Sequence, residues 1–439
     1  MVLFVHGSAE MYGSDKVLLN LAQSLVAGGE FTPVVVLDED GPLRSALHAA
    51  GVEVHVGAVV KISRSLFTPR ALPALWRTAR KSLRDLDTAV ASRSVALVHS
   101  NTLAVLGGAL WAWRRRQRHL WHVHEIILKP ALVSAGLPWL AARLSQVVLA
   151  VSTPTAAWLL ARQPRLGRRL HVVFNGMQAP PQADDLAEAA ALSFRGRIGA
   201  HDDDVVVTVA ARLNHMKGQG LLIEALGLLK RQQRLGRIRA AVVGDVYAGH
   251  EDPRPRLRAR VDELGLNGLV SFNSFEVDIF SVWRGSQIAV VPSTEPESFG
   301  MVAIEAMACG LPVLAAGHGG LLDIVLPEQT GLLFEPGNAA ALADALARLA
   351  ADPALRARLA PPARNASARS FPWTARPSAP RPSTVNWWPH EDLAHPGYAG
   401  CARCARRLRN LCRTTGSVPG GVRLAGGGVL PGSGQGPRG

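Results

Sequence analysis

Short apolar runs alternate with longer amphipathic segments over most of the chain. The run VLFVHG (2–7) ends in glycine, and SDKVLLNLAQSLVAGG (14–29) has apolar residues at helical spacing before two glycines that stop a helix. The runs PVVVL, VALVHSN, HLWHVHE and SQVVLAVS repeat the pattern. Strands that alternate with helices predict βαβ units and a parallel sheet. Residues 1–176 therefore predict a Rossmann-like N-terminal domain.

A second domain of the same kind is expected after a break. Residues 177–204 are polar and rich in Pro, Ala and Asp, which predicts a linker. The pattern restarts at VVVTVAARL and continues through AAVVGDV, IAVVPS and GLPVLAA, so 205–360 predict a second Rossmann-like domain. The sequence thus predicts an α/β protein with two such domains facing across a cleft. Ligands bind beyond the carboxyl ends of parallel strands, so this architecture suits a reaction between two substrates.

The last part of the chain has no periodic pattern. Residues 375–439 are rich in Pro, Gly and Arg and predict an irregular tail. The change just after SFPWTA motivates the hypothesis that the tail is an out-of-frame translation; a genuine tail is the alternative. Three of the four cysteines lie here as C-x2-C-x7-C, without a fourth ligand at the usual spacing. No metal site is predicted.

The charge is strongly basic, at a formal +14. Nine arginines against Glu391 and Asp392 place half of this excess in the tail. A basic face can meet anionic lipids, nucleic acid or phosphorylated substrates. However, only six of the 48 basic residues are lysines, a bias that GC-rich coding explains. With neither a signal peptide nor a long apolar run, the sequence predicts a cytoplasmic protein.

Two glutamates bracket an apolar segment in VPSTEPESFGMVAIEAMACGLPVLAAGHGG (291–320). Gly300 is positioned to open a helix, and Gly310 with Pro312 to close it, so Glu297 precedes the helix and Glu305 lies inside it. Carboxylates in such a segment either lie on an outward face or bind a ligand rich in hydroxyl groups.

This segment resembles the donor-site signature of retaining glycosyltransferases with the GT-B fold, in the large family called glycosyl transferases group 1, or family 4. The resemblance implies that Glu297 contacts hydroxyls of the donor sugar and that Glu305 contacts the nucleotide ribose. N–H groups at the start of the helix would bind the diphosphate: Phe299, Gly300, Met301 and Val302. The alternative is a solvated helix face with an acid near its N-terminus.

The segment AARLNHMKGQGLLIEAL (210–226) is similar to the family segment that holds the donor diphosphate. The corresponding cations are Arg212 and Lys217. Fixed cations stabilise the charge that grows on a leaving diphosphate, so neither a metal nor another cofactor is expected. The alternative is two surface cations near a turn.

The loop MYGSDKVLLNLA resembles the family's Gly-rich loop after the first strand. Gly13 and Ser14 would allow close approach of the backbone to a phosphate or the acceptor. Tyr12 and Asp15 depart from the family pattern, which usually has a second glycine and a glutamate. A simple turn before a helix is the alternative.

Two further residues complete the predicted site. His124 in WHVHE resembles the family histidine near the reacting sugar, where it would bind a hydroxyl or position the donor. A packed histidine is the alternative. Gly244 in VVGD is expected to serve a tight turn near the nucleotide.

The acceptor has no short signature. Residues 62–86 and 111–119 mix arginines with Leu, Phe and Trp at spacings that suit a basic amphipathic surface. The resemblance implies a glycan or lipid-linked acceptor and peripheral contact with the inner face of the plasma membrane. Ordinary packing with solvated arginines is the alternative. Nucleic acid is not expected as a partner, because no recognised module is present.

The expected function is transfer of a sugar from a UDP- or GDP-sugar to such an acceptor, with retention of anomeric configuration, in cell-envelope glycan synthesis. One alternative is a catalytically impaired protein that binds a nucleotide-sugar but lacks the family's last helix. A second is a nucleotide-sugar epimerase. A dinucleotide-dependent dehydrogenase is disfavoured, because no G-x-G-x-x-G follows an early strand.

Overall fold

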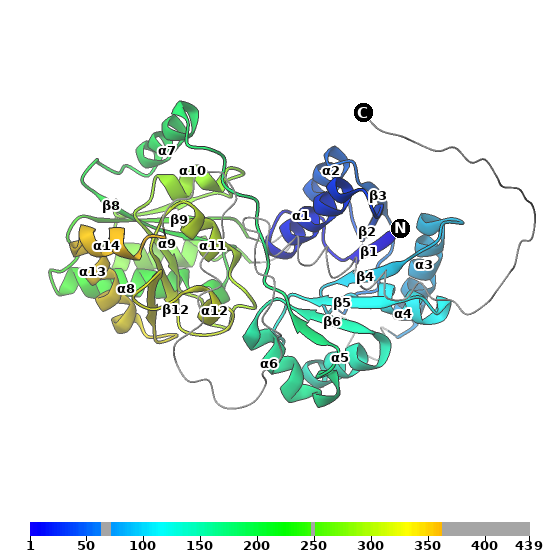
Figure 1. The fold of residues 1–439 in the computed structure, drawn as a ribbon. Helices are drawn as coiled ribbons and strands as arrows, with labels where there is room; N and C mark the ends of the chain where they lie inside the picture. The colour runs from blue at the N-terminus through cyan, green and yellow to red at the C-terminus, as the bar shows by residue number, and fades with distance from the viewer. Residues whose placement is uncertain (63–71, 247–250, 362–439) are drawn as a thin grey trace, which may run out of the picture.

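The computed structural model describes residues 1–62, 72–246 and 251–361. These residues form two parallel β-sheets, each flanked by helices, which lie side by side in Figure 1. The α/β class and the two Rossmann-like domains predicted from the sequence are confirmed. The boundaries assigned to the domains and the linker stay predictions.

The first sheet has the strand order β3-β2-β1-β4-β5-β6-β7. Its strands are β1 (Val2–His6), β2 (Pro33–Leu37), β3 (Glu53–Val56), β4 (Leu97–Asn101), β5 (His119–Val123), β6 (Val147–Ala150) and β7 (Leu170–Val172). The helices between them are α1 (Gly13–Gly28), α2 (Pro42–Ala49), α3 (Leu72–Val90), α4 (Gly107–Arg115), α5 (Ala131–Leu144) and α6 (Thr153–Arg162), with a short 3₁₀ turn, η3 (Pro164–Leu166).

Helices on both faces explain why strands such as β1 and β2 are buried at every position. In β1, Val2 and Phe4 pack with residues of α1 and α2, whereas Leu3 and Val5 pack with residues of α3 and α4. Successive side chains of a strand point to opposite faces, so burial on both faces removes the usual alternation with polar residues. Gly29 ends α1 in the left-handed conformation, as the Gly pair predicts.

The second sheet has the strand order β10-β9-β8-β11-β12-β13. Its strands are β8 (Val205–Ala210), β9 (Ile238–Val243), β10 (Val270–Asn273), β11 (Ile288–Val291), β12 (Val313–Ala316) and β13 (Gly331–Phe334). Its helices are α8 (Gln219–Arg231), α9 (Arg254–Glu263), α10 (Ile279–Arg284), α11 (Met301–Ala308), α12 (Leu321–Ile324), α13 (Ala339–Ala351) and α14 (Pro353–Leu359), with a 3₁₀ turn, η4 (His215–Lys217).

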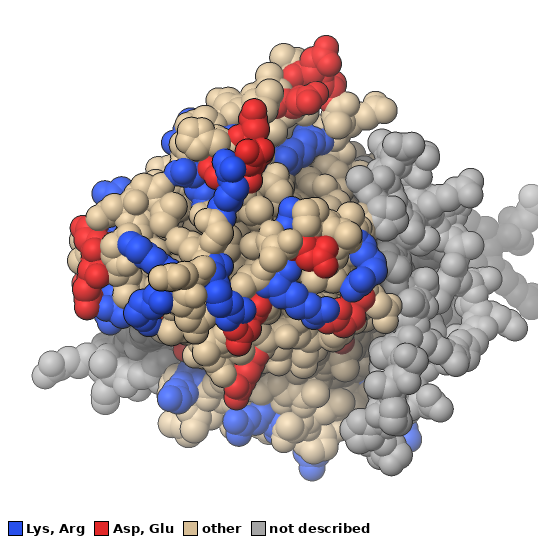
Figure 2. Space-filling view, turned by 90° about the vertical axis from the view of Figure 1, so that its left-hand side faces the viewer, with Lys and Arg blue, Asp and Glu red and all other residues tan. Residues whose placement is uncertain are grey.

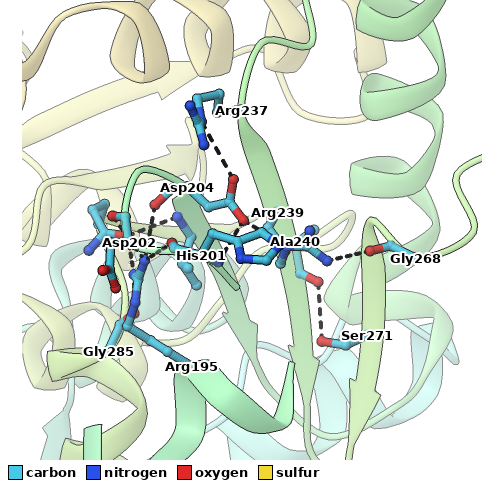
Figure 3. A network of polar contacts seen from close by, with 12 residues as sticks. Arg195, His201, Asp202, Asp204, Arg237, Arg239, Ala240, Gly268, Ser271 and Gly285 are labelled. Atoms are coloured by element: carbon cyan, nitrogen blue, oxygen red, sulfur yellow. Dashed lines mark hydrogen bonds and ion pairs between the residues drawn. The ribbon is translucent and has the colours of Figure 1, made fainter. Parts of the chain in front are cut away.

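The segment 177–204, for which the sequence predicts a linker, contains a helix, α7 (Asp185–Arg197). Phe194 of α7 is fully buried in the core of the second domain, and α7 packs against α10. Arg195 donates to the carbonyl of Gly285, and Asp204 accepts from Nε of Arg239 at 3.0 Å (Figure 3). The last part of this segment is therefore fastened to the second sheet.

Two predictions from the sequence fall wholly or partly outside the described residues. They are the irregular tail 375–439, with its three cysteines, and residues 63–71 of the basic amphipathic stretch.

Within the part of the chain that is described, no helix has both the length and the apolar character that a membrane crossing needs. On the side of the second domain that faces away from the first, basic and acidic side chains are interspersed (Figure 2).

Each sheet has one position at which the direction of its connections reverses. In the first sheet this switch lies between β1 and β4, and in the second between β8 and β11. The loops that leave neighbouring strands at such a point diverge and leave room for a ligand beyond the carboxyl ends. These two positions locate the site.

Candidate active site

The loops at the two switch points meet where the domains touch. The loop after β1 and the start of α1 contact residues that follow β8 and β11. At the start of α6, Thr155 donates its hydroxyl to the carbonyl of Ser298 at 3.1 Å. The junction is therefore built from the carboxyl-end loops of both sheets.

Glu297 lies in the loop between β11 and α11 and is 13% exposed. Its Oε1 accepts from Nζ of Lys217 and from Oγ of Ser293, each at 2.6 Å. Burial alone would raise the pKa of Glu297, but the charge and hydrogen bond of Lys217, with the bond from Ser293, outweigh it and lower the pKa. The carboxylate is thus held ionised beside a cation.

Glu305 lies inside α11 and is 5% exposed. Its Oε1 is 3.0 Å from Nζ of Lys16, which belongs to the first turn of α1 in the other domain. A buried carboxylate needs a compensating charge, and here the N-terminal domain supplies it. The predicted ribose-binding acid is therefore a point of contact between the two domains.

The first turn of α11 lies against the Gly-rich loop of the N-terminal domain. Gly300 precedes the helix with φ of 114°, a backbone conformation that residues other than glycine rarely adopt. The side chain of Phe299 is 3% exposed and packs into the core, so only its backbone is available to a ligand. A Cβ built on Gly13 would be 3.6 Å from Met301, which brings the Gly-rich loop against the first turn of α11.

Arg212 follows β8 and turns toward the N-terminal domain. Its guanidinium carbon lies 3.7 Å from the ring centre of Tyr12, and one of its terminal nitrogens lies 3.7 Å from Oε2 of Glu10. Guanidinium groups stack on aromatic rings in this way. Lys217 is thus paired within its own domain, whereas Arg212 is held by residues of the other one.

Gly244 follows β9 with φ of 140°, and a Cβ there would lie 2.1 Å from the carbonyl oxygen of Ala211. Only glycine fits this close approach of two backbones. The turn after β9 therefore packs directly behind the residue that precedes Arg212.

His124 follows β5, and its Nε2 is 3.0 Å from Oδ1 of Asn101 at the end of β4. Burial holds the pKa of His124 well below its usual range, and the neighbouring imidazoles of His122, His6 and His99 lower it further. The ring is therefore neutral at physiological pH. The side-chain amide of Asn101 also donates to the carbonyl of Ser14 at 3.2 Å, which joins His124 to the Gly-rich loop.

The predicted residues thus gather at one junction, in separate groups. Lys217 contacts Glu297, Gly13 faces Met301, Gly244 supports the Arg212 loop, and His124 joins Ser14 through Asn101. Their assigned roles stay predictions.

Four residues of the junction were not singled out from the sequence: Glu10, Lys16, Asn101 and Ser293. Asn101 and Ser293 had a usable signal, because each is a polar residue at or just past the carboxyl end of an apolar strand. Glu10 and Lys16 had none, since their partners lie in the other domain.

Among the side chains whose placement is described, no group of three or more His, Cys, Asp or Glu residues is arranged to hold a metal ion. The expectation that no cofactor is needed stays a prediction.

Two parallel sheets that meet through their carboxyl-end loops define the GT-B class of fold. The sequence model of the family "Glycosyltransferase Family 4" matches residues 11–179, and that of "Glycosyl transferases group 1" matches residues 193–366. A D-inositol 3-phosphate glycosyltransferase of Salinispora arenicola is 30% identical over 342 residues, which are 73% of this chain and 75% of that protein. The chain belongs to the glycosyl transferases group 1 family.

Other curated relatives match over a shorter range. A protein of the same name from Xylanimonas cellulosilytica is 37% identical over 211 residues, which are 47% of this chain. The chain covers 48% of that protein's length and 42% of the length of its counterpart in Saccharomonospora viridis.

Solved structures support the fold assignment. Anabaena HepE, in complex with UDP and glucose, has a TM-score of 0.68 and 26% identity, with 82% of this chain and 93% of that chain covered. WaaG, a glycosyltransferase of lipopolysaccharide biosynthesis, has a TM-score of 0.59 and 16% identity, with 81% of this chain and 92% of that chain covered. The GT-B fold that the sequence motif predicts is confirmed.

Proposed function

We propose that the protein transfers a sugar from a UDP-sugar to a hydroxyl group of an acceptor, with retention of anomeric configuration. The family assignment supports sugar transfer. The similarity to HepE, whose structures contain UDP or UDP-glucose, favours UDP over GDP as the donor nucleotide.

One observation carries the proposal: the cluster of Lys217, Glu297 and Ser293 at the switch point of the second sheet. An ionised carboxylate that accepts from a lysine and a serine can also accept from sugar hydroxyls. A sugar bound to Glu297 would replace part of the hydrogen bonding that Lys217 now gives to this carboxylate. Lys217 would then be free to turn toward the diphosphate.

The chemistry assigned to the site is front-face displacement. The bond between the anomeric carbon and the diphosphate oxygen breaks, and the acceptor oxygen bonds to the same face of that carbon. The acceptor proton passes to the leaving diphosphate. Arg212 and Lys217 would stabilise the charge that grows on the diphosphate, and His124 would hold a hydroxyl of the sugar. The motif's resemblance to retaining enzymes is the basis for assigning retention.

Two acceptor classes are proposed for testing. The resemblance favours a glycan or lipid-linked acceptor at a membrane surface. The names of the curated relatives favour D-inositol 3-phosphate, and the match over 73% of the chain makes this acceptor a specific candidate.

The test is an assay of purified protein with UDP-glucose and each acceptor, followed by proton NMR of the product. We expect release of UDP and a product whose anomeric coupling matches that of the donor. A product of opposite configuration would contradict retention, and absence of UDP release with every acceptor would contradict transfer from UDP-glucose to either acceptor class.

The alternatives are less favoured. A match to glycosyltransferase families over both domains does not favour an epimerase. An impaired binding protein would bind UDP in a calorimetric titration but release none from UDP-glucose in this assay. That result would point to the segment after residue 361 as the next part to replace.

A further inference from the structure

Asn101 is fully buried at the end of β4, at the switch point of the first sheet. Its side-chain nitrogen is 3.2 Å from the carbonyl oxygen of Ser14, a group that can only accept. The amide oxygen must therefore face His124, whose Nε2 lies 3.0 Å away. An amide oxygen also only accepts, so Nε2 of His124 carries a proton and donates a hydrogen bond to Oδ1 of Asn101.

The same amide is supported from behind by His6, the last residue of β1. Nδ1 of His6 is 3.2 Å from the side-chain nitrogen of Asn101, and Nε2 of His6 is 2.6 Å from Oδ1 of Asp15. Asp15 in turn accepts from the backbone N–H of Tyr12 through its other oxygen, at 3.0 Å. His6 and Asp15 are each 1% exposed, so this chain of contacts is shielded from water.

We infer that Asp15, His6 and Asn101 form a positioning network that fixes the orientation and tautomer of His124. Its Nδ1 is then free of a proton and accepts a hydrogen bond from a hydroxyl of the donor sugar. The inference rests on the proposed function, because it deepens the role of His124 at that site. Asn101 is the positioning residue in direct contact, and His6 and Asp15 act through it.

The network also links the sugar side of the site to the contact between the domains. Tyr12, whose backbone bonds to Asp15, stacks on Arg212 of the second domain. Lys16, the residue after Asp15, pairs with Glu305. The loop that meets the second domain and the ring of His124 are therefore held by one connected set of hydrogen bonds.

The direct test is NMR of protein labelled with ¹⁵N in its histidines, with the His124 signals assigned by their loss in His124→Gln. We expect a proton on Nε2 that exchanges slowly with water. Asn101→Leu and the smaller Asn101→Ala should both abolish the slow exchange. Asn101→Asp keeps an acceptor oxygen and should retain it.

Ser100→Ala is the matched control, since Ser100 is the adjacent buried residue and bonds to His119 instead. The proposal is overturned if the wild-type ring carries its proton on Nδ1. It is also overturned if Asn101→Leu and Asn101→Ala both fold and keep the slow exchange, or if Ser100→Ala loses the slow exchange.

A double-mutant cycle separates positioning from a general structural effect. Asn101→Leu and His124→Ala should each lower turnover of UDP-glucose about 10- to 100-fold, with affinity for UDP changed less than about twofold. Asn101→Leu should add nothing in the His124→Ala background, whereas a purely structural residue would give additive losses. If wild type binds no UDP-glucose, the proposed function fails, and the NMR result still decides whether the network fixes His124.

Discussion

At the scale of single residues, the site depends on charges that are buried but compensated. Glu297 and Glu305 each accept from a lysine, and the two lysines come from different domains. A carboxylate shielded from water without such a partner would become protonated and would lose part of its capacity to accept hydrogen bonds from hydroxyl groups.

We predict that Lys217→Met lowers the free energy of unfolding at pH 7 by about 1–3 kcal/mol, less than for a fully buried pair because the lysine is partly exposed. Lys217 helps to lower the pKa of Glu297 below its unfolded value, so this stabilisation is present above that value and is lost as pH falls through the folded pKa. The cost of the substitution should therefore shrink toward pH 4. Urea denaturation at several pH values measures it.

Lys81→Met is the matched control, because Lys81 pairs with Asp85 at 3.4 Å on an exposed helix face. Its cost should stay below about 0.5 kcal/mol. Equal costs for the two substitutions would contradict the role given to Lys217.

A second prediction concerns the buried histidines of the first sheet. Burial lowers the pKa of His119 and of His122 to about 3. The unfolded chain binds protons at these rings below about pH 6.5 and the folded protein does not, so stability should fall as pH drops from about 6.5 toward 3. In His122→Leu this loss should be shallower by about 1.4 kcal/mol per pH unit. Denaturant titrations at pH 7, 6 and 5 test this, and an unchanged slope would contradict it.

At the scale of elements, glycines let the loops beyond the second sheet approach one another closely. Gly244 brings the end of β9 against the residue before Arg212, and Gly300 begins α11 beside α12. Both have positive φ values and close neighbours, so each of these two turns is packed tightly against the segment beside it.

We predict that Gly244→Ala costs more than about 4 kcal/mol of stability, because the new Cβ would meet the Ala211 carbonyl at 2.1 Å. Gly236→Ala is the control: Gly236 also has a positive φ, of 56°, but a Cβ there has no neighbour within 4 Å. That substitution should cost only about 1–2 kcal/mol. Thermal or chemical denaturation of both variants gives the comparison, and similar losses would mean that the backbone contact is not tight.

At the scale of the whole molecule, the sequence predicts the architecture better than the junction. Strands such as β1 and β2 are buried at every position, which gives a strong local signal for a parallel sheet. The helix α7 was not predicted, because only Ala191 and Phe194 of its residues are buried and its apolar pattern is weak. The pair of Lys16 and Glu305 joins residues 289 positions apart, and no local pattern encodes such a contact.

The central claim is that the junction between the domains is a UDP-sugar site in which Glu305 binds the ribose. Calorimetric titration with UDP, GDP and ADP tests it directly, on wild type, on Glu305→Ala and on the control Glu328→Ala. Glu328 lies just before β13, and its carboxylate pairs with Arg348 of α13. We expect wild type and the control to bind UDP alike, in preference to GDP and ADP, and Glu305→Ala to bind it at least about 10-fold more weakly, as loss of a charged hydrogen bond would cause. No binding of UDP to folded wild-type protein, or equal binding by Glu305→Ala, would contradict the claim.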